Sequence, residues 1–451
     1  MLNLSRLGTA WCQLFAFLIL ISGNLSASPS TPSSVPSSVQ TSYVKMNGSR
    51  FEQAGNPYYF VGTNFWYGMN LGSLGPSGDR SRLLRELDRL KAAGVNNLRI
   101  IAGTEGPHTE PWRISPALQT APGIYDPELL QGLDFLLAEM KKRHLLAVVC
   151  LNNFWPWSGG MAQYLRWAGA RAIPYPPPQP GGTWGTFQNY AADFYSNRRA
   201  VAMSHDFIRM IVTRTNSYTG IKNSEDPAIM AWELANEPRG INNIAAYNHW
   251  IENTADLIKS LDKNHLVTTG SEGETPDPVA SGVNFVTNHG YKSIDYATAH
   301  IWAQNWNWYQ PERGEETFSR AVSKMKEYLT DHLEKAKKLG KPLVIEEFGL
   351  ARDAGSFDPA SPTHFRDRYF SEIFEQVYQF AKKGAPVSGI NFWAWAGEAE
   401  PKPPHGGFWS LGDPFVGDPP HENQGWYSIY SRDHDTIQLI SKYAAAMSSL
   451  R

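Results

Sequence analysis

From Val44 to the end of the chain, short apolar runs alternate with segments in which hydrophobic residues recur at helical spacing. Leucines fall at helical spacing between residues 80 and 93, and Gly94 follows them as a typical helix stop. Asp126-Pro127 precedes a second run of this kind and predicts a helix start there. Short, mainly apolar runs of strand length separate the helical runs, so the pattern predicts alternating strands and helices.

Strand-like and helix-like runs follow one another in a regular order, after a hairpin that turns at Asn47-Gly48. The predicted strands are 59–64, 97–101, 145–151, 229–234, 266–269, 296–300, 343–346 and 389–392. The predicted helices are 80–93, 127–140, 207–212, 245–261, 318–338, 365–382 and 436–447. Eight strand–helix units predict an α/β fold, a (β/α)8 TIM barrel with extended loops at the carboxyl ends of its strands. The alternative, an open doubly wound sheet, would be expected to carry a Gly-rich phosphate turn after its first strand, and Gly62-Thr63-Asn64-Phe65 is no such turn.

The first 42 residues differ in composition from the rest. Residues 1–27 combine Arg6, an apolar run over 11–21 and small residues near Ala27, which predicts a secretory signal peptide and a secreted or periplasmic protein. Residues 28–42 form a Ser/Pro-rich leader that cannot pack. We expect residues 43–451 to form one catalytic domain. Cys12 would leave with the signal, and Cys150 lies in an apolar run that predicts an inert, buried thiol.

Composition narrows the classes of partner. The 451 residues carry a formal net charge of -2, without the basic excess that a nucleic-acid-binding protein would show. The chain holds 16 Trp, 20 Tyr and 21 Phe, more aromatic residues than a core needs, so some should offer flat faces to a ligand. We expect no nucleic acid and, after signal removal, no membrane among the partners, and we expect a monomer.

Polar and aromatic residues gather where the predicted strands end, and this is where a barrel builds its active site. Two carboxylates on different strands, surrounded by Trp, Asn, Arg and His, suit cleavage of a glycosidic bond. One carboxylic acid protonates the leaving oxygen, and the second carboxylate meets the charge that develops on the sugar. Asn236-Glu237-Pro238 after the fourth strand and Glu347-Phe348-Gly349 after the seventh are the specific pair.

These motifs give the chain a resemblance to a known family. The segments WELANEPR at 232–239 and IEEFG at 345–349 resemble glycoside hydrolase family 5, over roughly Val44 to the C-terminus. The endo-β-1,4-mannanase branch fits best, because Arg239 directly follows Asn-Glu-Pro, GGMAQYLRW stands at 159–167 with a spacing one residue different from the usual one, and Trp393 lies on the eighth strand.

The resemblance implies roles for the two carboxylates. Glu237 would be the general acid/base and Glu347 the nucleophile of a retaining mechanism, in which the carboxyl groups lie about 5 Å apart. Glu346 and Glu347 should point to opposite sides of their strand, so only one of them should enter the site. We expect that one to be Glu347, with Glu346 paired elsewhere. Glu233 lies inside its strand and should have no catalytic role.

The other candidates would bind the sugar or tune the carboxylates. Arg99 would keep Glu347 ionised, Asn236 would donate to the hydroxyl beside the reacting carbon, and His300 would bind the substrate or the acid/base network. Arg239 would bind a sugar on the leaving-group side, and Trp393 would stack under the distorted sugar. Trp302 stands where many relatives have Tyr, so a hydrogen bond from that position to the nucleophile is in doubt. Four weaker candidates for glycone contacts are Trp66, Asn153, Trp155 and Glu272, and Trp395 should pack in the core.

The sequence therefore predicts retaining endo-hydrolysis of β-1,4-mannosidic linkages in mannan, glucomannan or galactomannan. Three alternatives stay open: a β-1,4-glucanase, since the two sugars differ only at one hydroxyl; an exo-β-mannosidase, since loops such as 174–182 set the length of the cleft; and a non-catalytic carbohydrate-binding barrel. The mechanism requires no cofactor, and we expect no metal site because no cluster of ligands stands out.

Overall fold

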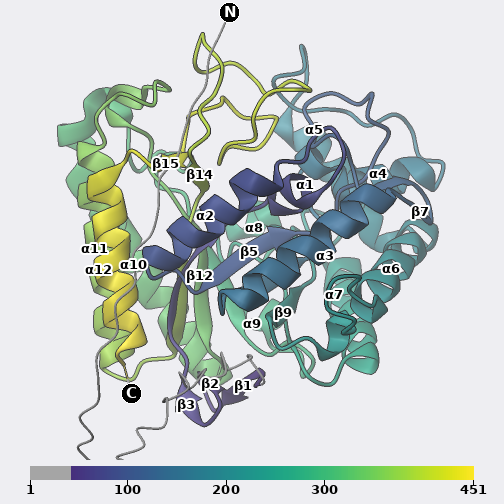
Figure 1. Cartoon of the computed structure of the whole chain (residues 1–451), viewed down its shortest axis with the longest axis horizontal. Coiled ribbons are helices and arrows are strands. Elements are labelled where there is room, and N and C mark those ends of the chain that lie inside the picture. The colour runs from purple at the N-terminus through teal and green to yellow at the C-terminus, as the bar shows by residue number, and fades with distance from the viewer. Residues whose placement is uncertain (1–41, 451) are drawn as a thin grey trace, which may run out of the picture. The chain divides into compact units, whose positions relative to one another are not determined.

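A ring of eight parallel strands forms the centre of the computed structural model, which describes residues 42–450 (Figure 1). The signal peptide and all but the last residue of the predicted leader lie outside the described residues. The ring runs in the order β10 (Leu266–Thr268), β9 (Ile229–Glu233), β8 (Leu146–Cys150), β5 (Asn97–Ile101), β4 (Phe60–Asn64), β13 (Val387–Phe392), β12 (Leu343–Phe348) and β11 (Ala297–Ile301). Hydrogen bonds from Asp295 N to Val267 O (2.7 Å) and from His300 N to Glu272 O (2.9 Å) join the two end strands. The predicted (β/α)8 barrel is confirmed.

Seven longer helices surround the ring near the predicted places (Figure 1). They are α2 (Arg80–Ala92), α3 (Pro127–Lys142), α6 (Arg198–Thr213), α7 (Ile244–Leu261), α10 (Gly314–Leu339), α11 (His364–Lys382) and α12 (His434–Ser448). The Asp126 side chain caps α3 by accepting from Glu128 N and Leu129 N. On α2, Leu83, Leu87 and Leu90 are buried, as the periodicity predicts.

A small hairpin sheet covers the amino end of the barrel, where Figure 1 shows it at the lower edge. Its strands are β1 (Val44–Asn47), β2 (Arg50–Gln53) and β3 (Asn56–Pro57). Val44 and Phe51 join an apolar cluster that fills the barrel at this end; its members from the ring and the segments beside it include Phe60, Leu146, Val148, Met230, Leu266, Tyr296 and Val344. This end of the barrel is therefore closed by packing.

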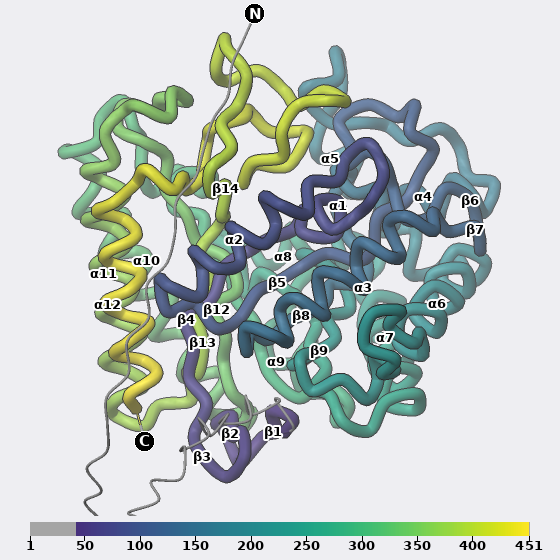
Figure 2. Tube along the Cα trace, viewed as in Figure 1, coloured from purple at the N-terminus to yellow at the C-terminus, as the bar shows by residue number. Residues whose placement is uncertain are grey.

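The opposite end carries the longer connections, which Figure 2 shows above the strands. Residues 398–428 connect β14 (Trp395–Gly397) to β15 (Ile429–Tyr430), and α4 (Gly160–Trp167) and α5 (Trp184–Ala192) lie between β8 and α6. Shorter elements are α1 (Gly68–Gly72), β6 (Gln119–Ala121), β7 (Ile124–Tyr125), α8 (Pro278–Ser281) and α9 (Phe285–His289). The hydrophobic pattern did not predict these elements, because they are short and rich in Gly, Pro and aromatic residues.

Two further features bear on the sequence predictions. Cys150 is a free, buried cysteine on β8, and burial raises the pKa of its thiol well above the ordinary value, as expected of an unreactive side chain. Within residues 42–450, no helix has both the length and the apolar character needed to cross a membrane.

Candidate active site

Glu237 and Glu347 come together at the carboxyl end of the barrel. Glu237 follows β9 and is 8% exposed, and Glu347 lies near the end of β12 and is 2% exposed. Glu237, His300 and Glu347 each offer an oxygen or nitrogen atom, and these atoms lie within 4.8 Å of one another. The two carboxylates that the sequence motifs paired therefore share one small site.

Both carboxylate oxygens of Glu237 are held by neighbours. Oε1 accepts from Nδ1 of His300 at 2.7 Å, and Oε2 accepts from Nε1 of Trp155 at 2.5 Å. The backbone of Glu237 has φ 51°, a left-handed conformation that costs energy for a residue other than glycine. Its amide donates to Gly270 O at 2.9 Å, which fixes this turn. The strained backbone at Glu237 thus orients its carboxyl group.

Arg99 on β5 links the two acidic strands. Its Nε and Nη2 donate to the two oxygens of Glu233 at 2.7 and 2.6 Å, and its Nη1 forms an ion pair with Glu347. Although burial acts to lower the pKa of Arg99, Glu233 and Glu347 raise it well above the ordinary value, so the cation is permanent. Glu233, to which the sequence motifs assign no catalytic role, lies inside its strand and orients Arg99.

Two asparagines complete this network. Asn64 accepts from Arg99 Nη1 at 2.9 Å, and Asn236 accepts from Nη2 at 2.8 Å. Asn236 Nδ2 donates to Asn153 Oδ1 at 3.2 Å, which leaves its second amide hydrogen for a ligand. Asn153 is fully buried and also bonds to Trp155 N and Ser158 Oγ, so it supports the loop after β8. Sugar contact by Asn153 stays a prediction.

The prediction that Glu346 and Glu347 point to opposite sides of their strand was wrong. Both side chains reach Arg99 and His300: Glu346 Oε2 lies 4.0 Å from Arg99 Nε and 3.8 Å from His300 Nε2, and Glu347 pairs with Arg99 and lies 3.3 Å from His300 Nδ1. The cause is an irregular register. Ala299 pairs with Ile345 but His300 pairs with Glu347, so Glu346 is an extra residue on β12. Such a bulge breaks the alternation of sides that the prediction assumed.

Arg239 and Glu272 form a second ion pair beside the acid/base candidate. Arg239 Nε and Nη2 donate to Glu272 at 2.6 and 2.8 Å, and Nη1 donates to Gln188 of α5 at 3.0 Å. The guanidinium also lies 4.9 Å above the ring of Trp155. Burial raises the pKa of Glu272, Arg239 opposes that shift and Glu237 adds to it. Both predicted residues are thus near the site and already paired to each other.

Aromatic side chains surround the floor of the site. Trp393 meets Trp302 edge-on at 5.9 Å and Trp157 at 6.4 Å. Trp66 donates from Nε1 to Gly417 O at 2.8 Å and packs against Trp157. The remaining space between them is about 10 Å³, lined by Asn64, Trp66, Arg99, Ile100, Ile101, Cys150, Trp157, Asn236 and Trp393. Trp395 is 1% exposed, as expected for core packing.

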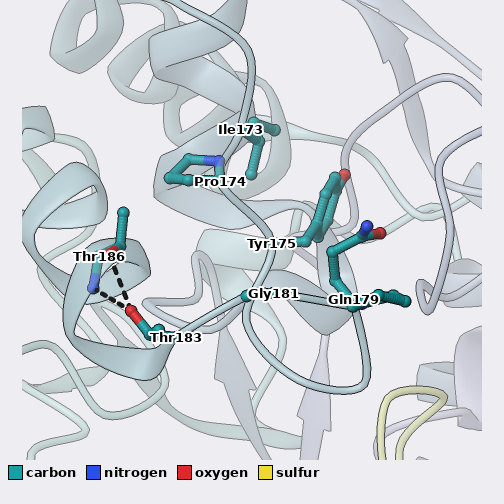
Figure 3. Close-up of a pocket in the computed structure, with 9 residues that line it drawn as sticks. Ile173, Pro174, Tyr175, Gln179, Gly181, Thr183 and Thr186 are labelled. Carbon is teal, nitrogen blue, oxygen red and sulfur yellow. Dashed lines mark hydrogen bonds between the residues drawn. The ribbon is translucent and has the colours of Figure 1, made fainter.

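Two loops meet across the mouth. Trp184, at the start of α5, contacts Trp155 at 5.5 Å on one side and His421 of the β14–β15 connection at 6.0 Å on the other. Tyr427 of the same connection packs at 5.0 Å against Trp302. Close to Trp184 the Pro/Gly-rich loop lines an open pocket of about 340 Å³ (Figure 3). Its lining is Ile173, Pro174, Tyr175, Gln179, Pro180, Gly181, Gly182, Thr183 and Thr186.

Sequence reasoning missed several members of the site. The sequence motifs assign no catalytic role to Glu233 or Glu346, and they predict Asn64 only as the end of a strand. Trp184 and Tyr427 carried no signal, because they lie on long connections whose course the hydrophobic pattern does not predict. Tyr427 does not replace the hydroxyl that Trp302 lacks, since its own hydroxyl donates to Asn305 Oδ1 at 2.5 Å.

The cluster of Glu237, His300 and Glu347 suits proton exchange. Arg99 already supplies a positive charge to Glu347, and Glu237 already accepts hydrogen bonds at both oxygens. Although burial acts to lower the pKa of His300, Glu347 and hydrogen bonds to the neighbouring glutamates raise it well above the ordinary value. The neighbouring glutamates thus favour a hydrogen on this imidazole, and we assign the cluster to acid/base chemistry.

Comparisons with known proteins agree with this geometry. A profile described as GH family 5 beta-mannosidase-like matches residues 41–451. Mannan endo-1,4-beta-mannosidases 5 and 2 of Solanum lycopersicum are each 34% identical over 367 residues, which cover 78% of this chain and 80% of theirs. A glycoside hydrolase family 5 mannosidase from Rhizomucor miehei superposes with a TM-score of 0.83 at 36% identity, over 91% of this chain and 98% of that one. The structure of its E202A mutant is a complex with mannosyl-fructose. An endo-1,4-beta-mannanase from Rhizomucor miehei, 23% identical over 90% of this chain and 99% of that one, shares the fold with a TM-score of 0.66.

Proposed function

Because the chain belongs to glycoside hydrolase family 5, in its beta-mannosidase-like group, we propose that it hydrolyses β-1,4-mannosidic linkages in mannan-type polysaccharides and oligosaccharides with retention of configuration. The observation that carries the proposal is the pair Glu237, after β9, and Glu347, near the end of β12, with oxygens within 4.8 Å. Retaining glycosidases hold their two carboxyl groups about 5–5.5 Å apart, whereas inverting ones leave room for a water between them. The curated relatives, named mannan endo-1,4-beta-mannosidases, support mannan as the substrate and cleavage within the chain.

The reaction proceeds in two steps. Glu347 attacks the anomeric carbon while protonated Glu237 gives its proton to the departing glycosidic oxygen. Water then attacks the glycosyl-enzyme, with Glu237 taking the proton from that water. Arg99 pairs with the Glu347 carboxylate and orients it for the attack, and its pairing with Glu233 keeps the guanidinium from turning away. In the first step the Glu347 carboxylate becomes an ester, and the loss of its charge favours the ionised Glu237 that the second step needs.

Substrate contacts follow from the free groups at the mouth. Asn236 offers its remaining amide hydrogen to the hydroxyl beside the reacting carbon, and Trp393 offers an indole face to the sugar ring. Arg239 and Trp155 lie beside Glu237, and the proposal puts the leaving sugar on their side. Arg239 is paired with Glu272, so both are oriented before a sugar arrives.

The test is a time course with mannan and with mannose oligosaccharides, followed by proton NMR. We expect the β-anomer of the new reducing end to form first and to mutarotate later. First appearance of the α-anomer would indicate inversion and contradict the mechanism. Carboxymethylcellulose is the matched control for the sugar, because a glucanase of this family would degrade it and leave mannan intact.

A second candidate function is exo-hydrolysis, the release of mannose from a chain end. The observation that favours it is the contact between Trp184 and His421, which brings the loop before α6 and the β14–β15 connection together over the mouth. A cleft bridged in this way accepts a chain end more easily than the middle of a polymer. Product analysis decides: mannose alone from the earliest time points favours the exo mode, and a ladder of oligosaccharides favours the endo mode.

We also propose an exported monomer. The first 27 residues have the composition of a secretory signal. Light scattering after size-exclusion chromatography tests the oligomeric state, and N-terminal sequencing of the secreted protein tests signal removal. A dimer in solution, or a mature protein that begins at Met1, would contradict these proposals.

A further inference from the structure

Glu346 is a buried carboxyl group that the proposed mechanism does not use. It is fully buried, and neither of its carboxylate oxygens has a hydrogen-bond partner among the described residues. A buried polar group without a partner is costly, so its retention calls for a reason. Nε2 of His300 lies 3.8 Å from Glu346 Oε2, closer than Arg99 Nε at 4.0 Å, and Nε2 also lacks a partner within residues 42–450.

The other nitrogen of His300 is part of the catalytic pair. Nδ1 lies 2.7 Å from Glu237 Oε1 and 3.3 Å from Glu347 Oε2. A hydrogen on Nδ1 can therefore reach the proposed acid/base, and it also faces the proposed nucleophile. A neutral imidazole carries only one hydrogen, and the partner of its other nitrogen decides where that hydrogen sits.

We propose that Glu346 is a positioning residue that shares a proton with Nε2 of His300, directly or through one water, and so keeps a hydrogen on Nδ1 directed at Glu237 and Glu347. The inference rests on the proposed function in one respect: this hydrogen serves catalysis because Glu237 and Glu347 are the proposed catalytic pair. The 3.8 Å separation exceeds a direct hydrogen bond, so a small rotation of Glu346 or one bridging water completes the contact.

Both protonation states of Glu346 have the same effect on His300. A protonated Glu346 donates its O–H to Nε2, which leaves the single hydrogen of a neutral imidazole on Nδ1. An ionised Glu346 accepts from Nε2–H of the imidazolium, which carries its second hydrogen on Nδ1. The proton moves between the Glu346 oxygen and Nε2 without gain or loss, so Nδ1–H is preserved as long as the pair keeps this proton.

The charged and titratable groups around Glu346 keep its pKa near neutral pH, so both of its protonation states are accessible. Arg99 of β5 faces it at 4.0 Å, Glu233 of β9 and Tyr296 before β11 share the interior, and Glu347 follows on its own strand. Burial and the charge of Glu233 raise the pKa of Glu346 to about 7, against the opposing effect of His300 and Arg99. Glu237 meets the same imidazole on its other side.

The experiment compares Glu346→Met and Glu346→Gln, which have side chains of similar length, with Glu327→Gln on the exposed face of α10 as the control. Nitrogen-15 NMR of histidine-labelled protein reports which imidazole nitrogen carries hydrogen, and His300→Asn identifies the signal. We expect Nδ1–H throughout the active pH range in the wild type and in Glu346→Gln, whose amide can still donate to Nε2. We expect a mixture of tautomers in Glu346→Met.

Kinetics give a second readout. In Glu346→Met, kcat should fall roughly tenfold or more while KM changes little, because Glu346 does not touch substrate, and Glu346→Gln should recover much of the loss. The pKa of His300 should fall in both variants, since the acidic partner is gone. An unchanged tautomer, an unchanged His300 pKa and an unchanged pH profile in Glu346→Met would overturn the inference. If the wild type fails to cleave mannan, the proposed function is wrong, but the nitrogen spectra still decide the role of Glu346.

Discussion

At their amino ends the eight barrel strands enclose apolar side chains, and at their carboxyl ends they enclose charged ones. The layer at the amino ends, here called the lower layer, includes Phe60 and Val344 next to the hairpin sheet. The layer at the carboxyl ends, here called the upper layer, holds Arg99, Glu233 and Glu346. Phe60 and Asn64 lie on the same short strand, β4, yet belong to different layers. A single strand of five residues thus carries a core side chain at one end and a side chain of the site at the other.

The difference shows how the barrel supports a costly site. Burying several carboxylates around one guanidinium lowers stability unless each charge is paired, and the Glu346 carboxyl has no hydrogen-bond partner among the described residues. Apolar packing below the site supplies the compensating stability, at about 25 cal/mol for each Å² of apolar surface removed from water. Changes in the upper layer should therefore act mainly on activity, and changes in the lower layer mainly on stability.

The largest effect is expected from Glu347→Ala in the upper layer. Loss of the nucleophile should reduce kcat by roughly 10⁴-fold or more, with thermal unfolding close to that of the wild type because Arg99 keeps its pairing with Glu233. Azide should restore turnover of an aryl β-mannoside and give the α-mannosyl azide. Turnover of mannan at an undiminished rate would remove Glu347 from the mechanism.

Glu237→Gln should reduce hydrolysis of mannan by about 10²–10⁴-fold, the contribution of a general acid/base. An aryl mannoside with a good leaving group needs no acid in the first step, so its phenol should appear in a burst followed by a slow phase. Pre-steady-state absorbance measures this burst. Equal losses on mannan and on the activated substrate, with no burst, would place the acid/base elsewhere.

Phe60→Ala tests the lower layer. The ring lies against Gly389, where an added Cβ would come within 2.1 Å of it, so truncation should open a cavity. We expect a loss of about 3–5 kcal/mol in the free energy of unfolding, measured by urea denaturation. Phe60→Leu should lose less. At a temperature where the variant is folded, kcat should stay near that of the wild type, and a collapse of kcat in the folded variant would show that the two layers are coupled.

Trp184→Ala tests the rim of the upper layer and should have the smallest effect. Its indole is 38% exposed between Trp155 and His421. Loss of one aromatic contact is worth about 0.5–1.5 kcal/mol, so KM for mannose oligosaccharides should rise by roughly 2–10-fold. The unfolding midpoint should not change. An unaltered KM for every chain length would show that sugars do not pass this side of the mouth.

The sequence predicted the barrel and its two principal carboxylates because each depends on local pattern. Helical spacing placed α2 and α10 within a few residues, and Asn-Glu-Pro and Glu-Phe-Gly identified Glu237 and Glu347. Glu346 was misjudged because its side of the strand depends on pairing with β11, which is not local. The contact of Trp184 with His421 was missed for a similar reason, since it joins two long loops far apart in the chain.

The extra residue on β12 also bears on how related chains are compared. Because sides alternate along a strand, deleting one residue from an evenly pleated segment reverses which positions face the axis. In β12 the extra residue shifts this alternation once, between Ile345 and Glu347. Phe348 still packs outward against Phe370 of α11, with the ring centroids 4.7 Å apart. Deleting Glu346 from β12 would leave the Glu-Phe-Gly motif unchanged in the sequence. Glu347 would then be the one acidic residue of this strand that faces the barrel axis.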